Sequence, residues 1–157
     1  MGMSQVRHPM DINPNAPVSA RHQITINAPI ETVWQLLTDI DQWPTWNSNI
    51  SAATLAGPMQ PGSTFRWKAN GTGIFSTLQA VEPHRYLSWT GKVIGTRAIH
   101  TWALEPLGDT VVVTTAESFE GWLVQLTKDM MQSTLDTSLV AWLTDLKRQA
   151  EQSRDRS

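Results

Sequence analysis

The residues best suited to chemistry in this sequence fall in one stretch, IHTWALEPLGDTVVVTTAESFEG, at residues 99–121. It alternates apolar and polar residues on both sides of Gly108-Asp109, a pattern that predicts a β-hairpin. A two-residue turn there sets two pairs of residues face to face, His100 with Glu117 and Trp102 with Thr115. A His and a carboxylate at this spacing can form a general acid/base pair, in which the His moves a proton and the carboxylate sets its tautomer. They can also form a buried pair that only satisfies itself or orients a polar ligand group.

Two further turns extend this register. Asn70-Gly71 is a strong hairpin signal that sets Trp67 opposite Ile74, and a turn at Ile94-Gly95 sets Trp89 opposite His100. One face of the sheet then collects Phe65, Trp67, Ile74, Ser76, Leu78, Leu87, Trp89, His100, Trp102, Leu104, Val113, Thr115, Glu117 and Phe119. A dry core has little reason to keep a carboxylate, so we expect this face to line a cavity.

Large and flexible side chains accompany the polar pair. Trp67, Trp89 and Trp102 can stack on a flat ring system or fill a core, and three Trp beside a His and a Glu favour a pocket lining. Met130 and Met131 fall where a C-terminal helix faces the sheet, where thioethers either adapt to a ligand or plug a gap.

Other chemistries find less support. Thr115 and Ser76 have no base arranged for nucleophilic work, so we expect them to donate or accept hydrogen bonds at most. No metal site is expected, because the chain has no cysteine and its remaining histidines show no ligand spacing, namely His8, His22 and His84.

The elements that must position these residues follow from periodicity. Ile24 and Ile26 are in phase in a short strand that ends at Pro29, after which a helix and a second short helix (41–47) are expected. Residues 49–120 have the period of six antiparallel strands, and residues 122–152 that of one long helix. Six hairpin-connected strands need a cover for their apolar face, and only the long helix is large enough to provide it. The fold class is α+β.

Composition sets the limits. A chain of 157 residues with 40% hydrophobic content suits one domain, expected at residues 21–152 between a flexible extension (1–20) and a short tail (153–157). A net charge of −2 and the absence of a long basic run argue against nucleic acid. No apolar run approaches a membrane span, the N-terminus lacks a signal-peptide core, and zero cysteines fit a cytoplasmic protein.

Four segments carry a family resemblance: INAPIETVWQLLTDIDQWPTWN, PGSTFRWK, VEPHRYLSWTG and IHTWALEPLGDTVVVTTAESFEGW. Over residues 21–150 they resemble the polyketide cyclase/dehydrase branch of the START-like (SRPBCC) superfamily, which includes the birch-pollen-allergen fold. The resemblance implies a helix-grip fold, in which a curved seven-stranded antiparallel sheet wraps a long C-terminal helix and encloses a hydrophobic cavity. The positions that match the family's cavity-facing pattern are Trp43, Trp46, Asn47, Trp67, Trp89, His100, Trp102 and Glu117.

These observations lead to a main hypothesis and two alternatives. We expect the protein to bind a hydrophobic small molecule, aromatic or polycyclic, between the sheet and the long helix, without a cofactor. His100 and Glu117 would meet its polar end, and the expected lining is Trp46, Asn47, Phe65, Trp67, Ser76, Trp89, Trp102, Thr115, Met130 and Met131. One alternative is a cyclase, aromatase or dehydratase that uses the same pair, and the superfamily also includes lipid carriers. The other is a protein-interaction domain, as in co-chaperones, that uses the outer sheet face or residues 1–20. The sequence decides neither catalysis nor oligomeric state.

Overall fold

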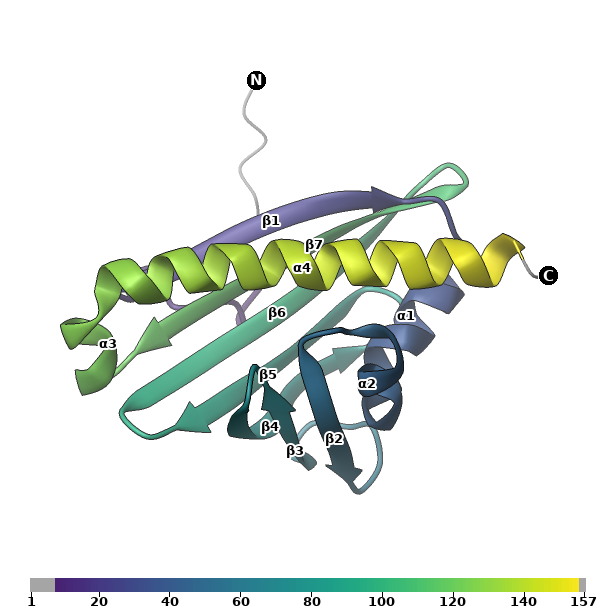
Figure 1. Ribbon diagram of the computed structural model, residues 1–157. Coiled ribbons are helices and arrows are strands. Elements are labelled where there is room, and N and C mark those ends of the chain that lie inside the picture. The colour runs from purple at the N-terminus through teal and green to yellow at the C-terminus, as the bar shows by residue number, and fades with distance from the viewer. Residues whose placement is uncertain (1–7, 156–157) are drawn as a thin grey trace.

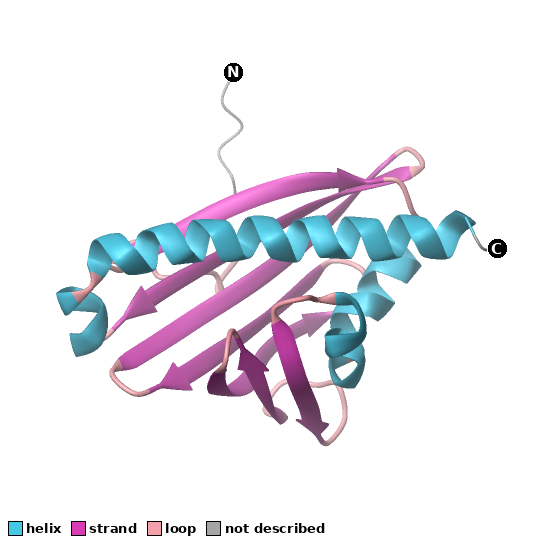
Figure 2. Ribbon diagram, in the orientation of Figure 1, coloured by secondary structure: helices cyan, strands magenta, loops and turns pink. Residues whose placement is uncertain are grey.

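A seven-stranded antiparallel sheet wraps around one long helix (Figure 1). The computed structural model describes residues 8–155. Along the chain the elements are β1 (Val18–Ile26), α1 (Ile30–Thr38), the 3-10 turn η1 (Ile40–Gln42), α2 (Trp43–Trp46), β2 (Ile50–Ala56), β3 (Thr64–Ala69), β4 (Thr72–Glu82), β5 (Tyr86–Val93), β6 (Thr96–Leu107), β7 (Thr110–Glu120), α3 (Trp122–Leu126) and α4 (Lys128–Asp155). The strand order β1-β7-β6-β5-β4-β3-β2 and the helix laid across the sheet confirm the helix-grip α+β fold (Figure 2).

The predicted register is confirmed at each of the three turns. His100 pairs with Glu117 and Trp102 with Thr115 across β6 and β7. Trp67 pairs with Ile74 across β3 and β4, and Trp89 pairs with His100 across β5 and β6. Both central residues of the β3–β4 turn have positive φ, Asn70 at 51° and Gly71 at 81°, which is the conformation that an Asn-Gly hairpin requires.

The expectation of one helix over residues 122–152 is wrong. The chain leaves the helical conformation at Thr127, whose φ is −132°, and this residue separates α3 from α4. Gly121 brings the start of α3 against the β5–β6 turn, where a Cβ on Gly121 would lie 2.3 Å from the Gly95 carbonyl oxygen. A single straight helix could not both close this end of the sheet and lie along its concave face, so the apolar period continues across a bend.

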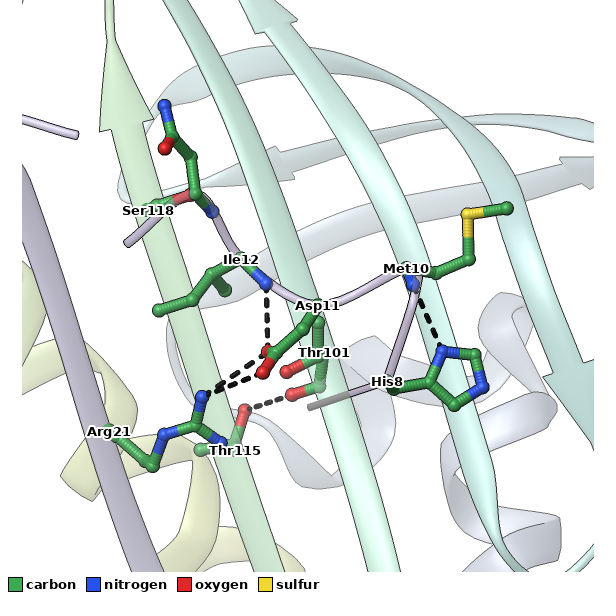
Figure 3. A network of polar contacts seen from close by, with 9 residues as sticks. His8, Met10, Asp11, Ile12, Arg21, Thr101, Thr115 and Ser118 are labelled. Atoms are coloured by element: carbon green, nitrogen blue, oxygen red, sulfur yellow. Dashed lines mark hydrogen bonds and ion pairs between the residues drawn. The ribbon is translucent and has the colours of Figure 1, made fainter. Parts of the chain in front are cut away.

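The outer face of the sheet is partly covered, which the sequence pattern does not indicate. We expected residues 1–20 to form a flexible extension; β1 begins at Val18, and residues 8–17 lie against the strands (Figure 3). Asp11 forms an ion pair with Arg21 at 3.1 Å, and the backbone N–H of Asn13 donates to the Ser118 hydroxyl at 3.1 Å. Under this segment, which we call the strap, small polar residues of the outer face are buried, namely Ser88, Thr101 and Ser118. Residues 1–7 lie outside the described part of the chain.

At the other terminus α4 continues to Asp155, beyond the expected domain end at residue 152. Leu135, Leu139, Trp142 and Leu146 recur along α4 at steps of four, three and four residues, and all four are buried as the apolar face of a helix that covers a sheet. Between residues 8 and 155, no helix combines the length and apolar character needed to cross a membrane.

Candidate functional site

The space between sheet and helix has a solid half and a hollow half. In the solid half Trp43 of α2 is fully buried, and the centroid of its ring lies 5.1 Å from that of Trp142, 5.3 Å from Trp89 and 5.6 Å from both Trp67 and Phe65. The indole N–H of Trp43 donates to the Leu37 carbonyl at 3.1 Å. Edge-to-face rings at these distances form a packed aromatic core.

Several predicted site residues belong to this solid half and do not line the cavity described below. They are Trp46, Asn47, Phe65, Ser76, His100, Trp102 and Thr115, and all are buried. Ser76 accepts a hydrogen bond from the Trp67 indole N–H at 3.0 Å. The ring of His100 lies 4.8 Å from that of Trp89 and 5.3 Å from that of Trp102. Sheet parity sorts inward from outward residues correctly, but it does not separate residues that fill the core from residues that face a void.

The hollow half is a cavity of about 420 Å³ between the sheet and the first half of α4. It exists because small residues face one another. Gly91 of β5 pairs directly with Ala98 of β6, and Thr134 and Ser138 lie above them on α4. These four short side chains leave space between the sheet and the helix.

The lining draws on six strands, β2 to β7, and on α3 and α4. The predicted residues that line the cavity are Trp67, Trp89, Glu117, Met130 and Met131. Ile74 and Phe119, which fall on the sheet face expected to line a cavity, also line it. The lining residues that the sequence pattern did not indicate are Asn49, Ile50, Ala69, Asn70, Thr72, Gly91, Val93, Thr96, Ala98, Leu123, Thr134, Leu135, Ser138 and Trp142. One usable signal was in the sequence: Met130, Thr134, Ser138 and Trp142 recur every four residues, which puts them on one face of a helix.

Glu117 is the only ionisable residue in this lining. Its side chain is 13% exposed, and withdrawal from water disfavours the carboxylate, so burial raises the pKa of Glu117 to about 8. At neutral pH the cavity wall therefore carries a carboxylic acid, whose O–H can donate a hydrogen bond into a largely apolar space.

His100 lies behind Glu117 and is held in one tautomer. The Thr115 hydroxyl donates its only hydrogen to the Thr101 carbonyl at 3.0 Å (Figure 3), so at its 2.9 Å contact with His100 it must accept from Nε2–H. Nδ1 of His100 then carries a lone pair and lies 3.6 Å from Oε2 of Glu117. Burial lowers the pKa of His100 to about 3. The pair is a neutral imidazole beside a neutral acid, and a small approach would let Glu117 donate to Nδ1.

The arrangement of His100 and Glu117 allows proton transfer. The described side chains of the site show no arrangement for nucleophilic catalysis. Within residues 8–155, no three His, Asp or Glu side chains gather closely enough to share a metal ion. The lone Nδ1 atom of His100 has no hydrogen-bond partner at its present distance, and Glu117 is the group through which it reaches the cavity.

Comparisons with known proteins agree with this architecture. A search of curated protein sequences finds no match. Among solved structures, a hypothetical protein from Helicobacter pylori superposes with a TM-score of 0.83 at 19% identity, over 96% of this chain and 98% of its own. A START superfamily protein from Mycobacterium smegmatis gives 0.74 at 14% identity, over 85% and 97% of the two chains. The Zhui aromatase/cyclase from a Streptomyces species gives 0.75 at 15% identity, over 85% and 93%. At these identities the likeness shows the shared fold alone.

The sequence itself carries the assignment to a family. Residues 17–151 match the profile of the family described as polyketide cyclase / dehydrase and lipid transport. This match covers most of the chain, including every strand of the sheet and the part of α4 above the cavity. The chain therefore belongs to the polyketide cyclase / dehydrase and lipid transport family.

Proposed function

We propose that this protein binds a neutral hydrophobic small molecule with two or three rings in the cavity beneath α4. The observation that carries the proposal is the cavity itself, about 420 Å³ with a single ionisable residue in its wall. This volume falls within the range of small-molecule sites and is roughly three times the ~150 Å³ of an apolar cavity that holds one benzene. Trp67, Trp89 and Trp142 offer flat surfaces on which rings can stack.

The polar end of the ligand would meet Glu117. A protonated carboxyl in a largely apolar wall is withdrawn from bulk solvent, so a ligand carbonyl or ether oxygen that accepts its hydrogen bond gains more than it would in water. A carboxylate ligand is disfavoured, because the cavity lining offers no cation to offset the cost of burying its negative charge. The family description covers both cyclases and lipid carriers, and a ring-containing ketone is compatible with either activity. Zero cysteines suit a cytoplasmic location, which we include in the proposal.

A matched pair of variants tests the proposal. Ser138→Leu places a larger side chain in the cavity, whereas Ser133→Leu makes the same change on the same helix at an exposed position outside the lining. With the neutral fluorescent probe N-phenyl-1-naphthylamine, we expect saturable binding to the wild type, at least about tenfold weaker binding to Ser138→Leu, and unchanged binding to Ser133→Leu. Equal binding by all three proteins would place the probe elsewhere and refute the cavity as the binding site.

A second candidate function is catalysis of proton transfer on an enolisable polyketide-like substrate. The observation that favours it is the contact between Glu117 and the His100 lone pair, which gives the cavity-facing acid a proton acceptor behind it. Glu117 would exchange a proton with the substrate, and His100 would act through Glu117 as a positioning residue. The enzyme hypothesis predicts that Glu117→Gln abolishes turnover of a poly-β-ketone substrate while probe affinity stays within about threefold. Retained turnover in that variant would rule this role out.

A further inference from the structure

Large apolar side chains are exposed together at one end of the molecule. They are Ile94 of the β5–β6 turn, 80% exposed, Leu126 of α3, 75%, Met130 of α4, 65%, and Trp122 of α3, 62%. Figure 1 shows α3, the start of α4 and the β5–β6 turn at the same end, opposite the C-terminus. We call these four residues the apolar tip. A single exposed apolar residue is ordinary on a protein surface, but a group of this size at one place calls for a partner.

The apolar tip is continuous and adjoins the cavity. Gly95 lies beneath Trp122, since a Cβ on Gly95 would be 2.8 Å from the indole ring, and the Leu123 N–H donates to the Gly95 carbonyl at 3.1 Å. Leu126 follows Trp122 by four residues on α3, so both lie on one side of that helix. Met130 belongs to the cavity lining as well as to the tip. The cavity lining therefore runs out into the exposed patch.

Positively charged side chains lie near the apolar tip. The register aligns Arg66, Phe75, Lys92 and Arg97 in one row across β3 to β6, on the outer face of the sheet. The Arg66 guanidinium lies over the Phe75 ring at 5.0 Å. Among the residues that the structure describes, neither Arg66 nor Lys92 forms an ion pair within 4 Å with an acidic side chain, and Arg97 is 3.9 Å from Glu120. Lys128, at the first position of α4, is exposed between α3 and Met130, but the adjacent exposed Asp129 offsets its charge, so the row on the sheet carries the positive charge of this end.

Acidic residues gather at the opposite end. Glu31 of α1, Asp39 and Asp41 flank the helices that follow β1, and Glu105 and Asp109 lie at the β6–β7 turn. Figure 1 shows α1 and this turn at the end opposite α3. At that end Lys147 and Arg148 of α4 are each paired with an acidic side chain, Glu151 and Asp145. The molecule thus has a basic end that carries the apolar tip and an acidic end, so an anionic surface attracts it in one orientation.

We propose that the apolar tip docks on an anionic lipid bilayer, with Trp122, Leu126 and Ile94 at the level of the headgroups and the row of cations above them facing the phosphates. Trp is enriched at membrane interfaces, and cations near an anionic leaflet add attraction that falls with ionic strength. A bilayer would pass an apolar ligand into the cavity along Met130 without exposing it to water. A second copy of the chain fits less well, because a two-fold interface would set the row of cations on one copy near the same row on the other.

The test uses vesicles of phosphatidylcholine with or without phosphatidylglycerol, and the full chain. Ile94→Ser with Leu126→Ser changes the two most exposed tip residues, neither of which lines the cavity. The matched control, Leu107→Ser with Val140→Ser, changes apolar residues that are 61% and 48% exposed outside the tip. We expect the wild type and the control to co-sediment with the phosphatidylglycerol vesicles at low salt, and the tip variant to partition at least about tenfold more weakly.

Three outcomes would overturn the docking proposal. They are a wild type that stays in the supernatant, a control that loses as much partitioning as the tip variant, and a wild-type dimer in light scattering that the tip substitutions dissociate. The last outcome would assign the tip to a second copy. Lys92→Gln and raised salt should each weaken co-sedimentation, and insensitivity to both would contradict the electrostatic part. Binding of N-phenyl-1-naphthylamine should be unchanged in the tip variant, so the cavity proposal and the docking proposal can fail separately.

Discussion

His100 on β6 and Glu117 on β7 face each other with 3.6 Å between Nδ1 and Oε2, at the boundary between the aromatic core and the cavity. Both groups are neutral at pH 7, because burial lowers the pKa of His100 to about 3 and raises the pKa of Glu117 to about 8. The Thr115 hydroxyl fixes the His100 tautomer, so the imidazole lone pair is directed at the carboxyl group. The pair therefore holds the carboxyl proton of Glu117 next to the cavity.

The first prediction concerns stability against pH. Glu117 has a folded pKa above its ordinary value of 4.5, so its contribution is complete below pH 4.5 and is lost as pH rises through about 8. His100 has a folded pKa below its ordinary value of 6.5, so its contribution is complete above pH 6.5 and is lost as pH falls through about 3. The two slopes oppose each other between pH 4.5 and 6.5, and stability should fall from pH 6.5 to 8.

Glu117→Gln should remove that alkaline decline, because glutamine has no proton to lose. Urea unfolding at intervals from pH 4.5 to 8.5 would measure the free energy of unfolding of both proteins. We expect the value for the variant to rise relative to that of the wild type over this range. Parallel pH profiles for the two proteins would show that Glu117 titrates at an ordinary pKa.

The second prediction concerns Thr115. Thr115→Val keeps the shape but removes the acceptor of the His100 Nε2–H, and an unpaired buried donor costs about 1–3 kcal/mol. Thr115→Ser keeps the hydroxyl and should lower the free energy of unfolding by less than about 1 kcal/mol relative to the wild type. Urea midpoints at pH 7 give the difference, and ¹⁵N shifts of the His100 ring report whether the Nε2-protonated tautomer persists. An unchanged ring spectrum in Thr115→Val would mean that another group sets the tautomer.

The third prediction concerns the entry into α3. Gly121 has a φ of 130°, and an added Cβ would lie 2.3 Å from the Gly95 carbonyl oxygen. Gly121→Ala should therefore cost about 2–4 kcal/mol, from backbone strain and overpacking together. Gly71 also has a positive φ, 81°, but nothing lies within 4 Å of an added Cβ there, so Gly71→Ala should cost about 1 kcal/mol. Thermal unfolding would separate the two, and equal losses would contradict the steric explanation.

The fourth prediction concerns the strap. Burial, with a smaller contribution from the Asp11 charge, raises the pKa of Tyr86 to about 12, and the His8 ring is stacked on the Tyr86 ring at 3.8 Å. Removal of residues 1–17 should bring this pKa back toward its ordinary value of 10. Tyr86 is the only tyrosine in the chain, so absorbance at alkaline pH reports on it alone, with circular dichroism as the check that the sheet remains folded. A phenol that titrates identically with and without the strap would show that the strap does not shield it.

Turn chemistry made the register of the sheet predictable. Asn70-Gly71 and Gly108-Asp109 each admit few backbone conformations, and each fixes the pairing of a whole hairpin. The pairing of Trp89 with His100 followed in the same way from the turn at Ile94-Gly95. Local sequence was sufficient because a hairpin is a local structure.

The extent of the cavity depends on tertiary packing and could not be predicted in this way. Trp43 fills half of the inner face, and it reaches that position through α2, which is remote in sequence from the strands it covers. The void forms where Gly91 and Ala98 lie beneath Ser138, and no period in the sequence shows that these small residues face one another. The strap was also missed, because residues 8–17 bind the sheet by single hydrogen bonds and ion pairs with no repeating apolar pattern.

The inner face of the sheet is divided into a packed half, the aromatic core that stabilises the fold, and a hollow half, the cavity. Gly91, Ala98, Thr134 and Ser138 line the cavity and are not among the rings packed around Trp43, so substitutions at these four positions can reshape the cavity while the aromatic core stays intact. New ligand preferences can therefore arise by single steps, each tolerated by an intact fold. Over evolutionary time this arrangement would produce one scaffold that serves both the synthesis and the transport of apolar molecules.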